Sequence, residues 1–202
     1  MKIQNVNLIG ISGKAGSGKD TVGKIIQLQS TLSDSGSWEI KKFAYKLKLI
    51  SSILTGIDIK DFEDQSFKET ELGPQWNTNP AGKIGTKWAC PMTVRQLLQK
   101  LGTEALRDNL HNNVWINALF VDYIYNSKWI ITDVRFKNEY ESVKSKGGML
   151  IRVNRPGYGT SMKALANDHI SETELDGYDF DYTIENNGSL EDLVFKVNNI
   201  IK

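Results

Sequence analysis

The amino-acid sequence predicts an α/β fold with a mainly parallel central sheet, within a single domain. Short apolar segments at residues 3–11, 129–132 and 149–153 have the length and composition of buried strands. Segments at 19–29 and 136–146 place apolar residues at helical spacing and alternate with those strands. Alternation of this kind is typical of parallel sheets, because each connecting helix returns the chain to the same end of the sheet.

The remaining segments fit the same scheme. We expect a short strand at 38–43, helices at 44–54, 93–110 and 114–124, a strand at 182–185, and a last helix at 190–201. Thr93 and Ser189 are suitable N-caps for two of these helices. Residues 56–91 are rich in polar residues, Gly and Pro, so we expect a loop-rich insertion there, in which a hairpin is possible. Residues 155–172 look irregular and suit a lid.

The bulk composition limits the classes of function. The chain has 202 residues, of which 40% are hydrophobic and 24% charged, and its net charge is +1. A dedicated nucleic-acid binder would normally show a basic excess, so we expect no nucleic-acid partner. The apolar stretch at 6–11 is too short for a membrane span, so we expect no membrane partner either. The single cysteine, Cys90, excludes an intrachain disulfide and suits a cytoplasmic location.

A glycine-rich loop follows the first predicted strand. It matches the G-x-x-x-x-G-K pattern of a phosphate-binding P-loop, and we assign ATP binding to Gly13, Lys14, Ala15, Gly16, Ser17, Gly18, Lys19, Asp20 and Thr21. The glycines let backbone N–H groups turn toward phosphate oxygens, and the next helix points its positive end at them. Asp20 stands where Ser or Thr usually binds Mg²⁺, and Thr21 follows it. Either residue can therefore be the metal ligand.

A second group of polar residues follows the predicted strand at 129–132. Asp133, Arg135 and Glu139 lie just beyond its carboxyl end, where open α/β sheets bind ligands. Asp133 is suited to orient Mg²⁺ or an acceptor group, and Arg135 to grip a phosphate in bidentate fashion. Glu139 lies one helical turn farther on and can pair with Arg135 or reach a sugar hydroxyl. The alternative is an ion-pair cluster that caps a helix.

The predicted helix at 93–110 has a polar face as well as an apolar stripe. Arg95, Gln99 and Thr103 share one helical face, and Glu104 and Arg107 share another. These polar residues form either a binding surface or a solvated helix face. Arg155 follows the strand at 149–153 and begins the predicted lid, which would bring it to the transferring phosphoryl group. We assign no chemical role to His111 or His169.

Taken in order, these segments resemble the bacteriophage deoxynucleoside monophosphate kinases. The resemblance rests on the loop with its Gly18-Lys19-Asp20-Thr21 ending, Phe43-Ala44 with Lys48, the pattern from Arg95 to Arg107, Trp115, the pattern from Asp133 to Glu139, His169-x-Ser171-Glu172, and the segment 186–189. It covers most of the chain outside 56–91.

The resemblance implies a three-layer P-loop NTPase fold of the NMP-kinase-like type, with ATP and Mg²⁺ as donor and a deoxynucleoside monophosphate as acceptor. By position, it implies acceptor contacts from Phe43, Lys48, Arg95, Gln99, Thr103, Arg107, Trp115, Asp133, Arg135 and Glu139. The residues expected to act on the reacting groups are Lys19, Asp133, Arg135 and Arg155. Trp115 is a candidate wall beside the sugar C2′ or a plain core residue, and Phe43 or Tyr45 is the alternative wall.

Two other functions remain open at this point. One is a kinase for another phosphorylated metabolite, of the dephospho-coenzyme A or phosphomevalonate type. The other is a nucleotide-binding module without phosphoryl transfer. The N-K-x-D base-reading motif of GTPase switches is absent from the sequence, and residues 132–134 offer one carboxylate where motor ATPases usually need an acidic pair. A homodimer is possible, and a phage-encoded enzyme would work in the host cytoplasm.

Overall fold

The computed structural model describes residues 6–32, 37–77, 90–124, 127–157 and 173–201. The helices and strands follow one another in the order β1 (Leu8–Ser12), α1 (Lys19–Leu32), β2 (Glu39–Lys41), α2 (Tyr45–Thr55), α3 (Val94–Gln99), α4 (Val114–Phe120), β3 (Trp129–Val134), α5 (Lys137–Ser145), β4 (Met149–Asn154), β5 (Tyr182–Glu185) and α7 (Leu190–Ile201). The described residues form two compact units. The first comprises Met1–Phe43 and Leu119–Lys202, and the second Ala44–Ala118.

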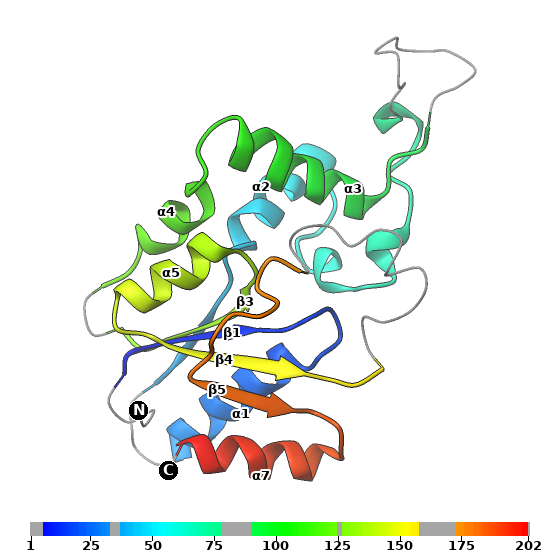
Figure 1. Cartoon of the computed structure of the whole chain (residues 1–202). Helices are drawn as coiled ribbons and strands as arrows, with labels where there is room; N and C mark the ends of the chain where they lie inside the picture. Colours follow the sequence, from blue (N-terminus) through cyan, green and yellow to red (C-terminus); the bar gives the residue numbers. More distant parts are fainter. Residues whose placement is uncertain (1–5, 33–36, 78–89, 125–126, 158–172, 202) are drawn as a thin grey trace. The chain divides into compact units, whose positions relative to one another are not determined.

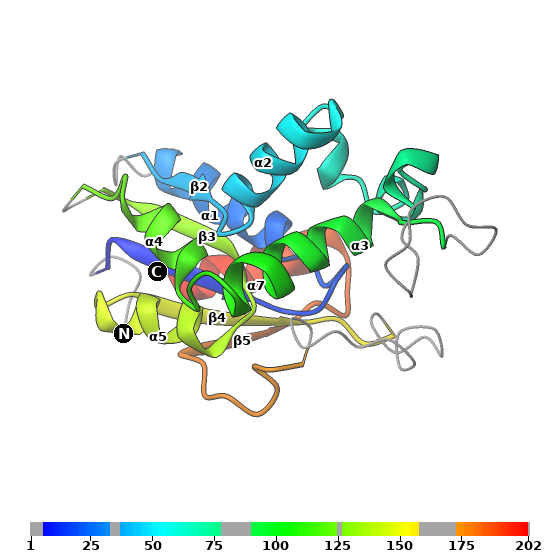
Figure 2. The same ribbon diagram turned by 90° about the horizontal axis from the view of Figure 1, so that it is seen from above.

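The first unit contains a five-stranded sheet in the order β2-β3-β1-β4-β5, with every pairing parallel (Figure 2). The predicted α/β class with a mainly parallel sheet is therefore confirmed. Because all strands run the same way, their carboxyl ends share one edge: Ser12 at the end of β1 pairs with Val134 and Arg152. The segments that follow β1, β3, β4 and β5 consequently leave the sheet at that edge.

Helices cover both faces of this sheet (Figure 1). Helices α1 and α7 pack together on one face, and α5 packs against β1 and β4 on the other, which gives the three layers expected. The three inner strands β1, β3 and β4 are nearly continuous runs of buried apolar residues, as in parallel sheets covered on both sides. Helix α1 approaches β3 so closely that a Cβ on Gly23 would lie 2.6 Å from Cγ2 of Thr132.

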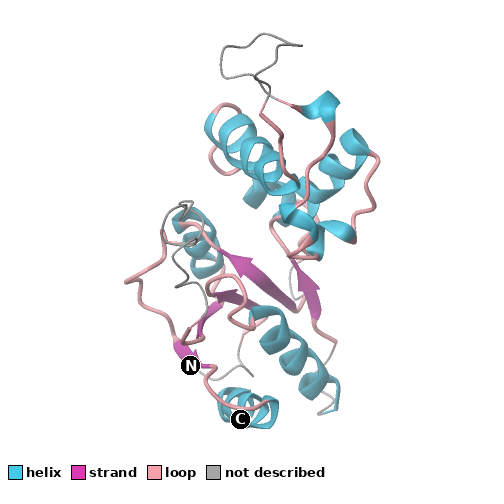
Figure 3. Ribbon diagram, turned by 90° about the vertical axis from the view of Figure 1, so that its right-hand side faces the viewer, coloured by secondary structure: helices cyan, strands magenta, loops and turns pink. Residues whose placement is uncertain are grey.

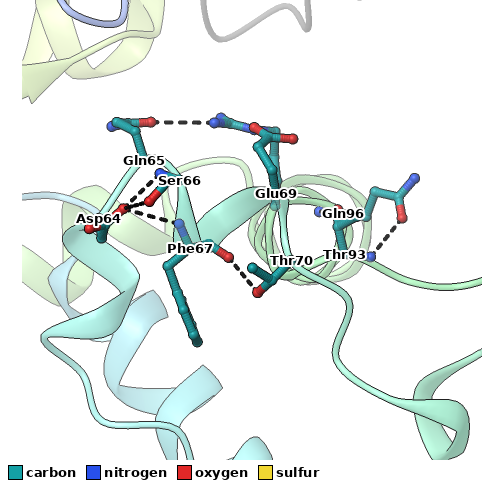
Figure 4. A network of polar contacts seen from close by, with 9 residues as sticks. Asp64, Gln65, Ser66, Phe67, Glu69, Thr70, Thr93 and Gln96 are labelled. Atoms are coloured by element: carbon teal, nitrogen blue, oxygen red, sulfur yellow. Dashed lines mark hydrogen bonds and ion pairs between the residues drawn. The ribbon is translucent and has the colours of Figure 1, made fainter.

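The second unit consists of helices and loops, without a strand in its described part (Figure 3). Its buried apolar residues are Phe62, Met92, Val94, Leu97, Trp115 and Ile116. Helix α3 begins at the predicted N-cap: the Thr93 hydroxyl accepts a hydrogen bond from the Gln96 amide at 3.2 Å, and the Gln96 side chain accepts one from the Thr93 amide at 2.9 Å (Figure 4). This reciprocal capping fixes where the chain turns into the helix.

The long helix expected at 93–110 is found, but it changes type. It is α-helical to Gln99 and π-helical from Lys100 to Asp108. In this part, Gly102 packs closely against α2, since a Cβ there would lie 2.7 Å from Cδ2 of Leu47. We did not expect this change, because π-helical turns are rare and the apolar spacing indicated an ordinary α-helix.

Three short 3₁₀ turns occupy the described part of residues 56–91, at Asp61–Glu63, Phe67–Glu69 and Pro74–Trp76. An antiparallel bridge joins Glu71 to Thr93, and residues 78–89 lie outside the described part. Most of the predicted lid, at 158–172, also lies outside it, together with His169. No helix among the described residues is long and apolar enough to cross a membrane.

Candidate nucleotide-binding site

The loop between β1 and α1 has the backbone of a phosphate cradle. Gly13, Gly16 and Gly18 have φ values of 154°, 75° and 100°, which L side chains rarely adopt. Space is also restricted at Gly13, where a Cβ would lie 2.4 Å from the Val153 carbonyl oxygen and 2.6 Å from Ser17 Oγ. The glycines of the P-loop pattern are therefore required by the local geometry.

Two buried side chains of this loop, Lys19 and Ser17, have groups that suit contact with an anion. Lys19 is 7% exposed, and its ammonium donates a hydrogen bond to the Lys14 carbonyl at 2.8 Å. Ser17 is 2% exposed, and its hydroxyl has no hydrogen-bond partner among the described residues. A buried hydroxyl without a partner is costly, and a bound phosphate oxygen would satisfy it. These residues fit a polyphosphate.

The Asp20 side chain contacts one residue of β3 and one residue that follows β2. Its Oδ1 accepts a hydrogen bond from the Thr132 hydroxyl at 2.7 Å and lies 3.1 Å from the Lys42 ammonium. Burial pushes the pKa of Asp20 upward, but the Thr132 hydrogen bond, Lys42 and the charge of Lys19 outweigh burial and lower the pKa. Asp20 is therefore a carboxylate at neutral pH. It and the half-buried Thr21 are the residues of this loop that suit Mg²⁺.

Two carboxylates hold the backbone near the carboxyl end of β3, Asp133 within the strand and Glu139 in helix α5. Asp133 Oδ1 accepts a hydrogen bond from the Phe43 amide at 2.8 Å and so fixes the chain as it leaves β2. Glu139 is 2% exposed, and its Oε2 accepts hydrogen bonds from the amides of Arg135 and Phe136 at 2.9 and 3.1 Å. Glu139 thus caps the start of α5 and fixes the backbone of Arg135. This contact corresponds to the capping alternative considered for Glu139.

Phe43 belongs to an aromatic cluster of the first unit. It is 3% exposed, and its ring packs edge-on against Phe120 at 6.1 Å. Phe120 in turn stacks on Trp129 at 6.2 Å, and Tyr123 packs edge-on against Trp129 at 4.8 Å. The Phe43 ring is therefore part of a buried cluster, whereas Tyr45, the other alternative to Trp115, is 54% exposed.

Arg155 lies beside the phosphate loop, as its position after β4 suggested. Its guanidinium Nη1 is 3.4 Å from the Gly16 carbonyl oxygen. The side chain is exposed. The structure thus brings together the loop, Asp20, Thr21 and Arg155 at one end of the sheet, with Asp133 and Arg135 at the end of β3 on the same edge.

In the second unit, Lys48 and Arg95 are held by the 3₁₀ turns. Lys48 is buried, with its ammonium 2.5 Å from Oε1 of Glu63. Arg95 donates to Glu69 at 2.6 Å and to Gln65 at 3.3 Å, next to the Asp64 turn shown in Figure 4. Both cations therefore tie the turns to the helices of this unit.

Trp115 and Arg107 are core residues of the second unit. Trp115 is 5% exposed, and its indole N–H donates to the Gly102 carbonyl at 2.8 Å. Arg107 is 6% exposed, and its Nη1 lies 3.4 Å from the Asn112 carbonyl. Gln99 and Thr103 are partly buried on the same long helix. Thr103 and Arg107 lie in its π-helical part, and such segments are frequent at functional sites.

Sequence reasoning missed a cluster of charges that supports the loop from β4. The Arg152 guanidinium donates to the Ser12 hydroxyl at 3.1 Å and to Asp176 at 2.5 Å, and Asp176 also lies 3.4 Å from the Lys14 ammonium. Sequence reasoning included Asn186 in the segment 186–189 of the resemblance but assigned it no role, and the structure shows its side-chain amide donating to the Ser17 carbonyl at 2.9 Å. The position of Asn186 directly after a predicted strand was the available signal.

Fold and loop together define a P-loop nucleotide-binding protein of the α/β class. Comparison with known proteins narrows this class, since residues 57–197 match the model of the family described as "Deoxynucleotide monophosphate kinase". The chain belongs to the deoxynucleotide monophosphate kinase family. The matched region lies outside the phosphate loop, so loop and family model are separate observations.

Individual relatives are viral. The chain is 32% identical over 130 residues to the deoxynucleotide monophosphate kinase of Enterobacteria phage T4, over 62% of this chain and 50% of that protein. It is 30% identical over 206 residues to a protein of Acanthamoeba polyphaga mimivirus, over 94% of this chain and 93% of that one. A third relative, the deoxynucleoside-5′-monophosphate kinase of Escherichia phage T5, is 27% identical over 184 residues, 68% of this chain and 71% of its own length. The match spans about half the length of the T4 protein.

Proposed function

We propose that this chain transfers the γ-phosphoryl group of ATP to a deoxynucleoside monophosphate and so forms the diphosphate. The observation on which the proposal rests is the phosphate cradle, with buried Lys19 and the unsatisfied Ser17 hydroxyl, in a member of this family. Phosphoryl transfer depends mainly on positioning and on stabilising charge, and a preformed cradle supplies both.

The donor phosphates bind to the loop of residues 13–21. Backbone N–H groups surround the phosphate oxygens, and the Lys19 ammonium moves from the Lys14 carbonyl to the β- and γ-phosphates. Asp20 or Thr21 would hold Mg²⁺, which neutralises phosphate charge when it is bound. Arg155 adds a second positive charge beside the loop.

We assign the acceptor phosphate to Arg135, whose backbone is fixed by Glu139. A guanidinium held this way can grip a phosphate in bidentate fashion. Asp133 acts at the same strand end, through its hydrogen bond to Phe43. The resemblance assigns six further residues to acceptor recognition: Lys48, Arg95, Gln99, Thr103, Arg107 and Trp115. Of these, Trp115 acts through packing rather than as an open wall, since it is buried.

An acceptor panel tests this assignment. Purified protein, ATP and Mg²⁺ are incubated with each deoxynucleoside monophosphate, with each ribonucleotide, and with dephospho-coenzyme A and phosphomevalonate. Separation of the products by chromatography should show diphosphates from deoxynucleotides. Product from either metabolite alone would favour the alternative kinases. ATP hydrolysis without any transfer would favour a nucleotide-binding module.

The family name also leads to a prediction about the sugar. A pocket that rejects an added hydroxyl by apolar contact discriminates by about 10²-fold, so we expect kcat/KM for dGMP to exceed that for GMP by about this factor. Equal or ribose-favouring values would contradict the deoxynucleotide assignment. We further propose that the protein acts in the host cytoplasm, since the relatives are viral. Light scattering tests whether it forms a homodimer.

A further inference from the structure

Asn186 is placed beside the phosphate loop by the sheet itself. It follows β5 directly. Its backbone N–H donates a hydrogen bond to the Asn154 carbonyl at 2.7 Å, which extends the pairing of β4 and β5 by one residue. Because the carboxyl ends of the strands share one edge, this register delivers the Asn186 side chain to the loop after β1. The side chain is half-buried there.

One hydrogen bond joins this side chain to the loop, and the side chain also lies close to Gly18. Its Nδ2 donates a hydrogen bond to the Ser17 carbonyl at 2.9 Å, across 169 positions of sequence. The same Nδ2 lies 2.6 Å from where a Cβ on Gly18 would be. Asn186 therefore holds the peptide bond between Ser17 and Gly18 by its carbonyl oxygen.

The direction of that peptide bond decides where its N–H points. A trans peptide is planar, and its C=O and N–H groups point in opposite directions. When Asn186 holds the Ser17 oxygen on its own side, the Gly18 N–H is turned away from Asn186. Gly18 has φ of 100°, and glycine permits many other orientations, so the loop backbone alone does not fix this one.

We propose that Asn186 is a positioning residue, which holds the Ser17–Gly18 peptide in the orientation that presents the Gly18 N–H to the donor phosphates. This inference rests on the proposed function, since it concerns the same donor site. Asn186 acts on the polyphosphate through the loop backbone. Its removal therefore weakens any ligand that fills the cradle, whether or not the ligand has a base and sugar.

The test measures binding by calorimetry with the full chain, with Mg²⁺ present and two probes: inorganic tripolyphosphate and a non-hydrolysable ATP analogue. Asn186→Ala removes the donor, and Asn186→Asp keeps the size but sets an acceptor oxygen against the Ser17 carbonyl. Asn187→Ala is the matched control. Asn187 is the next residue, is exposed, and accepts a hydrogen bond from Lys196 at 2.8 Å.

Both Asn186 variants should bind both probes about ten-fold more weakly, which corresponds to about 1.4 kcal/mol, and Asn187→Ala should match wild type. In steady-state kinetics, KM for ATP should rise while KM for the acceptor stays unchanged. Thermal unfolding shows which variants are folded, and Asn186→Asp replaces Asn186→Ala if the latter is not.

Several results would overturn the inference. Unchanged tripolyphosphate affinity in a folded Asn186 variant would contradict it. Weaker binding of the ATP analogue alone would also contradict it, because Asn186 would then contact the nucleoside. Equal losses in Asn187→Ala would indicate a general effect on the segment. A wild-type protein that binds neither probe would instead contradict the donor site and hence the proposed function.

Discussion

Replacement of Glu139 by alanine should destabilise the protein strongly. The carboxylate is 2% exposed and accepts two backbone hydrogen bonds, at 2.9 Å from Arg135 and 3.1 Å from Phe136. Without it, two amides at the start of α5 lose their acceptor. A lost helix cap costs about 0.5–2 kcal/mol, and an unsatisfied buried donor about 1–3 kcal/mol. We therefore expect a loss of about 2–4 kcal/mol.

Thermal unfolding measures this loss. For a chain of this size, 1 kcal/mol shifts Tm by about 2–4 °C, so Glu139→Ala should lower Tm by about 5–15 °C. Glu139→Gln should cost about half as much, because both bonds end on Oε2 and an amide oxygen can still accept them without the charge.

Glu141 provides the control on the same helix. It is exposed and only 3.8 Å from the Lys137 ammonium, a surface pair worth about 0.3–0.5 kcal/mol. Glu141→Ala should therefore lower Tm by no more than about 2 °C. If Glu139→Ala leaves Tm unchanged and raises KM for the acceptor, the carboxylate binds substrate and the capping argument is wrong.

Four further predictions concern other residues. Lys19→Ala should lower kcat by about 10²-fold or more with an unchanged far-UV spectrum, since its charge stabilises the transition state, and near-normal turnover would refute the loop assignment. Arg135→Ala should raise KM for the acceptor by an amount worth about 1.5–3 kcal/mol, whereas weaker ATP binding alone would place Arg135 in the donor site. Trp115→Ala should lower the free energy of unfolding by about 3–5 kcal/mol in urea titrations, and a loss below about 1 kcal/mol would contradict its core position. Burial raises the pKa of Asp181, but Lys144 and the backbone amide of Leu150 outweigh burial and lower that pKa. The Asp181 carboxylate therefore stabilises the fold fully above about pH 4, and this stabilisation is lost as the pH falls through the lowered pKa. Asp181→Asn should therefore flatten the dependence of Tm on pH below about pH 4, and an unchanged slope would contradict this assignment.

The sequence predicted the elements of the first unit well because its signals are local. The apolar run before Gly13, the helical spacing after Lys19 and the cap at Ser189 each depend on a few adjacent residues, and each predicted element is present. The position of Asp133 and Arg135 followed from one topological rule, that parallel strands share a carboxyl edge.

Contacts between segments that are distant in the chain could not be predicted from the sequence. The place of Asn186 after a predicted strand puts it at the right end of the sheet but does not identify Ser17 as its partner. The hydrogen bond from Thr132 to Asp20 was equally unpredictable, because each pair meets only through the sheet. Trp115 illustrates the same limit. A tryptophan suits a ligand wall and a core equally well, and only the bond from its indole to the Gly102 carbonyl shows how it is packed.

Phosphoryl transfer itself can be followed most directly by ³¹P NMR of a mixture of the protein, ATP, Mg²⁺ and dGMP. The proposed function predicts that one dGDP forms for each ADP, without free phosphate, and that both signals disappear in Lys19→Ala. Formation of ADP and inorganic phosphate without dGDP, repeated with each of the other deoxynucleoside monophosphates, would contradict it.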